Sequence, residues 1–586
     1  MLVVSKRTSS VINKWGKKML SNMKIKRKMI TKVILMNIFA GLLSSCGGGS
    51  SSDSIIEELP VSGNQPVVIS ASFKSTHFSG SENCAVCHNG IINNQAEDVS
   101  IESDWSTSMM ANATRDPFWQ AKVASEISRN PHLKEVIDDK CSRCHAPMAN
   151  VEAKFLSADV ELFDNGFLST ENRFFNHSND GVSCTVCHQI EDDGNLGTEQ
   201  GFSGNFSIVD LGTSTERTAF GQYQNPAINP MLMTTGFRPT YAEHISTSEV
   251  CATCHNLKTP FVDSSGQIAS TTPDSEFPEQ MIYSEWENSI YATSANQKSC
   301  QDCHMPKTDG VRIANRPSNL APRNNFSRHT LIGANTTMLD ILASNKTELR
   351  VSANGFEDAI EKTRTMLKSS AQIEVVNQDL TGEELTVQIR INNNTGHKLP
   401  GGYPSRRVYL HFVVNDELGN VIFESGKTNL DGSIVGADGD MDLTTFEPHY
   451  EEITQQDQVQ IYGTVMLNTD NEVSYTLLRA ASYAKDNRLT PVGFDKYAVT
   501  DDIRVAGAAF ADVNFNLGSD LITYKINVGT VNSLNYTVEL KYQTLAYGFV
   551  KDLFLDNSNP IVAKFEAMYN SASIRSETIA VIEGSI

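Results

Sequence analysis

The sequence predicts an α+β protein, in which a mainly helical and irregular domain is followed by an antiparallel β-sandwich domain. The cysteines after residue 46 all lie between residues 84 and 303, in five C-x-x-C-H repeats joined by irregular linkers. After residue 372 there is no cysteine, and several segments alternate apolar and polar residues with the period of two that strands require. We therefore expect domains over residues 71–334 and 372–586, with a helical connector over residues 335–371.

The composition indicates an ordinary globular protein with an acidic surface. The chain has 586 residues, of which 40% are hydrophobic and 20% charged, so wholesale disorder is not expected. Its formal net charge is −21. Nucleic acid is therefore excluded as the main partner, since binding it requires a basic face.

Residues 1–45 have the features of an export signal, and Met23 is an alternative start. They hold ten Lys and Arg residues and no Asp or Glu. The apolar run from Val33 to Leu43 suits a signal-peptide core and is shorter than the ~20 residues of a membrane span. Removing residues 1–45 leaves 38 basic and 69 acidic residues, a net charge of −31.

Cys46 follows Leu43-Ser-Ser in an arrangement that resembles a bacterial lipobox. In that interpretation Cys46 is lipid-modified and becomes the first residue of the mature protein; the alternative is ordinary cleavage beside an unused cysteine. Residues 46–70 begin with a Gly- and Ser-rich run typical of a flexible tether. Gly47, rather than Asp, favours the outer membrane, and either of its faces stays open.

The five repeats are the attachment signature of c-type haem. Two thiols three positions apart on one helical turn can bond both vinyl groups of one porphyrin, and the adjacent histidine then reaches the iron as its proximal ligand. The expected attachment residues are Cys84, Cys87, Cys141, Cys144, Cys184, Cys187, Cys251, Cys254, Cys300 and Cys303, with His88, His145, His188, His255 and His304 as the proximal ligands.

Three other uses of paired cysteines explain the pattern less well. Zinc sites and thiol redox sites do not require histidine after every second cysteine. Five disulfides would leave the five histidines without a role.

Strings around the repeats extend a resemblance to the bacterial multihaem c-type cytochromes over about residues 75–586. They include the segments 105–112, 180–188 and 300–306 and the sequence Thr-Gly-His-Lys-Leu-Pro-Gly-Gly over residues 395–402. The resemblance implies a cytochrome with five covalent haems and leaves its physiological role open.

The spacing of the repeats predicts closely packed haems. Cys84 and Cys300 are 216 residues apart over four intervals, or 54 residues per haem. A segment of that size buries little core of its own, so the porphyrins must supply much of the apolar interior. Closely packed haems exchange electrons rapidly, which points to conduction.

Each iron has one further axial position, for which the sequence offers seven candidates. His77, His177 and His244 each precede an attachment cysteine by seven residues, and His329 lies just past the last repeat. The fifth distal ligand is ambiguous. The candidates are His397 within residues 395–402, His132 nine residues before Cys141, and Met110 (or Met109), whose thioether would raise the potential of its haem.

The second half contains few chemical signals. Residues 356–367 predict a helix, residues 373–376, 385–391, 408–414 and 536–542 predict strands, and residues 478–484 look helical. Asp438-Gly-Asp-Met-Asp442 is a weak calcium candidate, since it lacks the Gly and Glu that an EF-hand requires. Arg406 and Arg407 either pair with haem propionates or are ordinary surface or structural arginines.

The sequence is compatible with two functions for the whole protein and with a third hypothesis that concerns the β domain. The first is a lipid-anchored electron-transfer protein of the cell envelope, with other redox proteins as partners. The second is an oxidoreductase in which one haem lacks a distal ligand and binds a small nitrogen or sulfur compound. In the third reading the β domain docks a partner and the haems are accessory.

Overall fold

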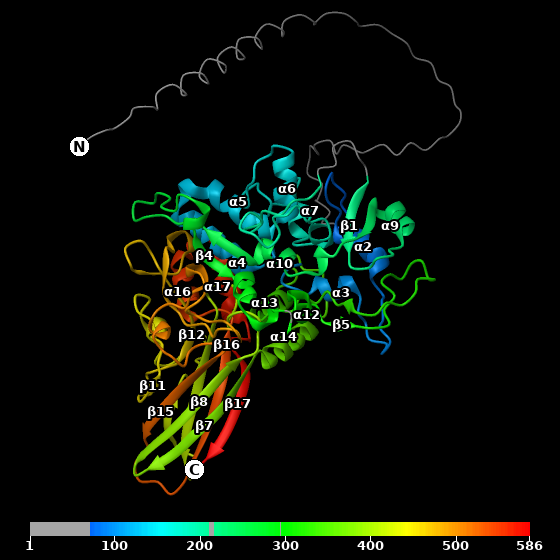
Figure 1. The fold of residues 1–586 in the computed structure, drawn as a ribbon. Helices are drawn as coiled ribbons and strands as arrows, with labels where there is room; N and C mark the ends of the chain where they lie inside the picture. Colours follow the sequence, from blue (N-terminus) through cyan, green and yellow to red (C-terminus); the bar gives the residue numbers. More distant parts are fainter. Residues whose placement is uncertain (1–70, 210–215, 294) are drawn as a thin grey trace, which may run out of the picture. The chain divides into compact units, whose positions relative to one another are not determined.

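The computed structural model describes residues 71–209, 216–293 and 295–586. The expected signal peptide, Cys46 and the tether lie outside the described residues. Short helices dominate up to residue 370 and long strands follow, which confirms the α+β prediction (Figure 1). Val67–Ile586 form one compact unit. Within the described ranges, no helix is long and apolar enough to cross a membrane.

Each attachment repeat lies on its own short helix, as the C-x-x-C spacing predicts. The five helices are α2 (Ser81–His88), α5 (Lys134–His145), α8 (Cys184–Cys187), α10 (Glu249–His255) and α12 (Cys300–His304). The other helices of this part are α3 (Ile101–Ser106), α4 (Pro117–Arg129), α6 (Pro147–Phe155), α7 (Phe175–Asn179), α9 (Ile228–Thr235), α11 (Ile282–Glu287), α13 (Thr336–Ser344) and α14 (Phe356–Ser370).

Six short strands pair locally between these helices and form no extended sheet. They are β1 (Arg217–Gly221) with β2 (Phe237–Tyr241), β3 (Asn256–Thr259) with β4 (Phe277–Met281), and β5 (Lys307–Thr308) with β6 (Phe326–Ser327). The apolar residues of this part form several clusters of different size, from three buried residues around Phe78 to twelve in the cluster that contains Trp119 and Phe167.

The second part is a two-layer sandwich. One sheet has the order β11-β15-β8-β7, from Glu452–Ile453, Ser519–Asn527, Glu384–Asn393 and Ala371–Thr381. The other has the order β13-β12-β9-β16-β17, from Val473–Ser474, Ile461–Leu467, Arg407–Asp416, Leu534–Gln543 and Glu577–Ser585; β10 (Val421–Ser425) pairs with β9 and β14 (Ser482–Asp486) with β12. All these pairs are antiparallel except β11 with β15.

One apolar core fills the space between the two sheets. Val387 and Ile389 of β8 and Leu410 and Phe412 of β9 are completely buried in the same cluster. They occupy alternate positions of their strands, which is why period-two alternation predicted these strands correctly. The predicted helix over residues 356–367 is also confirmed, as α14.

The predicted helix over residues 478–484 is wrong. Leu477–Arg479 form a single 3₁₀ turn, and β14 then pairs with the edge of β12. A short apolar run is ambiguous between the two conformations, and here the free edge of β12 decides. Two helices were not among the predicted elements, α16 (Tyr547–Leu553) and α17 (Pro560–Ser571), although Asn559 before Pro560 is a helix-start signal.

The weak calcium candidate is not supported, because its central carboxylate is already paired. Asp438–Met441 form the short helix α15. Both carboxylate oxygens of the buried Asp440 accept from Arg407, at 2.8 and 2.7 Å. The same pair shows that Arg407 serves the sandwich rather than a propionate.

Candidate functional site

Four of the five expected proximal histidines are held by the same kind of contact. In each, Nδ1 lies 2.5–3.2 Å from a backbone carbonyl oxygen. A carbonyl only accepts, so Nδ1 carries the proton and Nε2 is left with a free lone pair for a metal. The pairs are His88 with Ile313, His145 with Ala113, His188 with Phe220 and His304 with Ile332.

Burial keeps these imidazoles neutral. It lowers the pKa of His145 and of His255 to about 4 and also lowers those of the other three. His255 is nevertheless exposed by its own accessible surface.

Two of the proximal histidines face a second imidazole. The ring centroids of His188 and His329 are 6.3 Å apart with 23° between the planes, and those of His304 and His397 are 6.4 Å apart with 11°. Two metal–nitrogen bonds of about 2 Å, with about 1 Å within each ring, span roughly 6 Å. The two pairs therefore fit one iron each.

His329 and His397 also carry their proton on Nδ1, as a histidine that binds a metal through Nε2 does. Nδ1 of His329 lies 3.0 Å from the carbonyl of Ser327, and Nδ1 of His397 lies 2.8 Å from that of Lys398. Burial lowers the pKa to about 3 for His329 and to about 4 for His397. Each therefore presents a neutral Nε2.

His177 is a buried imidazole without a hydrogen-bond partner. Neither Nδ1 nor Nε2 contacts a polar group, the Phe73 ring lies 4.2 Å away, and burial lowers the pKa to about 4. A buried polar group without a partner is costly unless something else binds it. An iron ligand is such a role, so His177 fits the haem interpretation.

The three remaining histidine candidates differ in which ring nitrogen is free. His77 is buried, with Nδ1 3.3 Å from a carboxylate oxygen of Glu152, which leaves Nε2 free as in the proximal histidines. His244 uses Nε2 for the carbonyl of Ile190 at 2.8 Å, which leaves Nδ1 as its free nitrogen. His132 is exposed in the turn directly before the attachment helix α5, and its Nε2 lies 2.8 Å from the carbonyl of Gly266.

The segment that carries Met110 lies against the third attachment helix. Val182, two residues before Cys184, donates to the carbonyl of Met110 at 3.0 Å and accepts from Trp105 Nε1 at 3.0 Å. The Met110 side chain is half-buried. The neighbouring Met109 instead packs against the cluster of α13, α14 and α17.

The attachment thiols of different repeats are neighbours. Three pairs of these thiols lie close enough to shift each other's pKa: Cys84 with Cys184, Cys144 with Cys254, and Cys251 with Cys300. Among the described residues, none of the ten is joined in a disulfide. In the part of the chain that the structure describes, the one cluster of side chains with the spacing of a metal site contains no cysteine.

The loop over residues 395–402 is shaped around His397. A Cβ at Gly401 would lie 2.7 Å from Cε1 and Nδ1 of His397, so only glycine leaves room for the ring. Gly402 has φ +90°, a conformation that favours glycine. The carbonyl of His397 accepts from Thr395 Oγ1 at 2.6 Å and from Asn393 Nδ2 at 3.0 Å.

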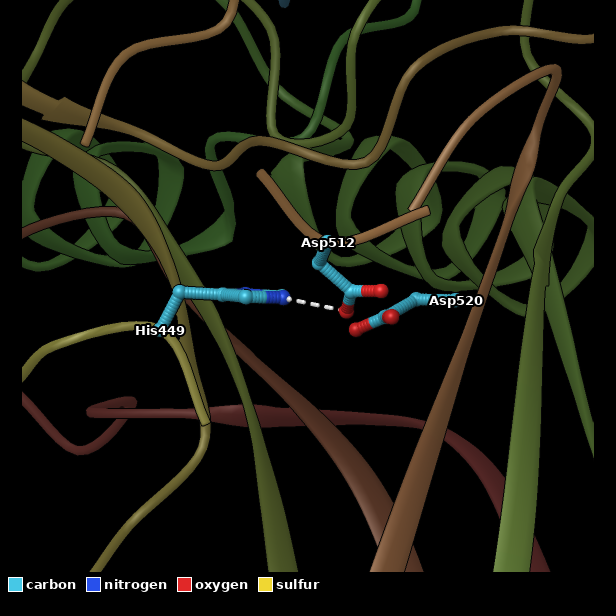
Figure 2. Close-up of side chains that lie close together, drawn as sticks. All are labelled: His449, Asp512 and Asp520. Carbon is cyan, nitrogen blue, oxygen red and sulfur yellow. Dashed lines mark hydrogen bonds and ion pairs between the residues drawn. The ribbon is translucent and has the colours of Figure 1, made fainter. Parts of the chain in front are cut away.

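The cysteine-free group consists of His449, Asp512 and Asp520, all buried inside the sandwich (Figure 2). His449 Nε2 lies 3.1 Å from Asp512. Nδ1 faces two amide nitrogens, Gln460 Nε2 and Asn487 Nδ2, each at 3.1 Å.

Backbone contacts fix both of these amides. Asn487 Nδ2 donates to the carbonyl of Ile461 at 2.9 Å, and Gln460 Oε1 accepts from the Tyr450 amide at 3.0 Å. Nδ1 of His449 is therefore an acceptor, and the proton lies on Nε2, where it is donated to Asp512. That nitrogen has no lone pair for a metal, so this group is an internal hydrogen-bond network.

The comparisons agree with the haem signature. The family model described as cytochrome c554 and c-prime matches residues 83–189, which carry the first three repeats. A penta-haem cytochrome c552 from Thermochromatium tepidum is similar over 88% of this chain and 100% of its own, with 16% identity and a TM-score of 0.47. No curated protein matches the sequence.

The family match, together with the neutral and oriented imidazoles, supports a multihaem c-type cytochrome with a haem-based redox role. The repeats themselves were readable from sequence. The carbonyls that orient the proximal rings were not, because any residue can supply a carbonyl, and these lie 28 to 225 residues from their histidines with no local pattern to mark them.

Proposed function

We propose that the chain is a five-haem electron-transfer cytochrome of the bacterial cell envelope. The observation that carries the proposal is the pair of facing imidazoles, His188 with His329 and His304 with His397, each with Nε2 free. An iron with two axial histidines has no open position and exchanges electrons rather than substrates. The bound haem would supply the one-electron chemistry, while the protein holds and orients it.

The thiol neighbours support a continuous route through the haems. They link the first repeat to the third, the second to the fourth and the fourth to the fifth. Cys254 also contributes to the raised pKa of Cys187, so these two thiols are close, and the third repeat is joined to the fourth. All five sites therefore belong to one connected set.

The purified mature protein is expected to carry five haems. A pyridine haemochrome assay and intact-mass analysis measure this number, because each thioether-bound haem adds its full mass. Cys187→Ala is expected to leave the third haem with a single thioether, which shifts its haemochrome band. A count below five in the parent protein would contradict the proposal.

One observation favours the alternative, an oxidoreductase with an open haem. Near Cys141 lie two buried oxygens without partners, Glu126 Oε2 and Tyr403 Oη, and burial raises the pKa of both groups. Protonated groups beside a haem can donate to a small bound molecule. Binding of carbon monoxide to the reduced parent protein would identify this function, and its absence would support the electron-transfer function.

The lipid anchor and the outer membrane are part of the same proposal. The lipobox-like sequence before Cys46 and the tether that follows support a mature protein attached to the membrane by acyl chains. Cys46→Ser is expected to release the protein into the soluble fraction or to block its processing. Fractionation and intact mass check this, and a variant that stays bound and normally processed would contradict it.

A further inference from the structure

Four charged side chains are buried together beneath the loop that carries His397. Their exposed fractions are between 0% and 7%. Two are cations and two are anions, so the group is neutral. We call it the charge quartet: Glu285, Lys398, Asp486 and Arg488.

The contacts form a closed set. Lys398 Nζ lies 2.7 Å from Asp486, and Arg488 lies 2.8 Å both from Asp486 and from Glu285. Glu285 also accepts from the Lys398 backbone amide at 3.1 Å. Burial alone would raise the pKa of Asp486, but Arg488 and Lys398 outweigh it and hold the pKa at about 2.

The quartet joins the haem-bearing part of the chain to the sandwich. Glu285 lies on α11, between the fourth and fifth repeats. Lys398 belongs to the loop, Asp486 is the last residue of β14, and Arg488 follows two residues later. The loop packs on α11 at two further points. A Cβ at Gly396 would lie 3.1 Å from Trp286, and one at Gly401 would lie 3.0 Å from Ile282.

We propose that the charge quartet positions His397 on the fifth haem and sets the charge near its iron. The sandwich is then an integral part of a redox centre rather than a docking module. This inference rests on the proposed function, because it takes His397 as an iron ligand.

The electrostatic half of the proposal follows from the neutrality of the quartet. Lys398 directly follows His397 in the chain, and Lys398 Nζ and Arg488 both contact the carboxylate of Asp486, so the quartet lies beside the ligand. Inside a protein, charges are screened less than in water. Removing one anion leaves an unbalanced cation, which favours ferrous iron; removing one cation does the reverse.

The test uses the full-length holoprotein and three variants: Glu285→Gln, Arg488→Gln, and the two together. First, His397→Ala identifies the fifth haem as the low-spin signal that it removes from the electron paramagnetic resonance spectrum. In a redox titration of that signal, Glu285→Gln is expected to raise the midpoint potential and Arg488→Gln to lower it. The double variant, again neutral, is expected to return close to the parent value.

Arg407→Gln is the matched control, since it breaks another buried ion pair of the sandwich, that with Asp440. It is expected to leave the fifth haem's potential unchanged. Shifts of the same sign in both single variants, or none, would overturn the proposal. If a single variant does not yield holoprotein, the double variant still tests the proposal. A midpoint potential of the fifth haem that differs from the parent value in the double variant would overturn it. If His397→Ala removes no signal, the ligand assignment fails instead.

Discussion

Replacing His329 with alanine is expected to open one of the five irons to carbon monoxide. His329 faces His188 at the separation that one metal ion between two imidazoles requires, and its Nδ1 is already held by Ser327. Without this ring, a haem iron held by His188 would lose one protein ligand and would be open to a small molecule. Optical titration of the reduced variant is expected to show one more carbon monoxide per chain than the parent binds.

His132→Ala is the matched control for this experiment. Its imidazole is exposed and bonded to the Gly266 carbonyl, so its removal is expected to change neither ligand binding nor the low-spin signals. Equal carbon monoxide binding by His329→Ala and the parent would contradict the ligand assignment. A gain in His132→Ala would return that residue to the ligand set.

Gly401→Ala is expected to remove the low-spin signal of the fifth haem although no ligand is changed. The added Cβ would lie 2.7 Å from two atoms of the His397 ring, and the ring cannot easily withdraw because Nδ1 is bonded to Lys398. Overpacking of this kind typically costs about 1–3 kcal/mol. Electron paramagnetic resonance and thermal unfolding measure the two effects.

Gly333→Ala is the control, because a Cβ there meets no atom within 4 Å and its φ is not positive. It is expected to leave both the spectrum and the stability unchanged. A Gly401→Ala protein with the parent spectrum would show that His397 is not bound to iron, or that the loop can yield at little cost.

The sequence predicted which residues attach the haems better than it predicted which residues hold and orient the iron ligands. The five repeats named the attachment residues because a covalent haem demands a fixed local spacing. His397 was one of several open choices, since 93 residues separate it from His304 and no local pattern connects them. Gly401 was visible only as part of a Gly-rich loop; its role follows from a ring that sequence alone does not place.

In the sandwich, too, features set by neighbouring residues were predicted and features set by residues distant in the sequence were not. Alternation predicted β8 and β9, because burial between two sheets is a property of each strand by itself. The buried quartet was not predicted, since Glu285 and Arg488 are separated by most of the second half of the chain. Residues 478–484 were misread because their conformation depends on β12, a partner distant in sequence.

The carbonyl contacts have a consequence for the order in which the protein can be completed. Ile313, which orients His88, lies 225 residues beyond it, whereas Ile332 lies only 28 residues beyond His304. Contacts between distant residues form late, since a long loop must close first. The haem site nearest the amino terminus is therefore expected to mature among the last. A fragment ending at residue 312 would hold every attachment cysteine, and yet its first site would be as unfinished as its fifth.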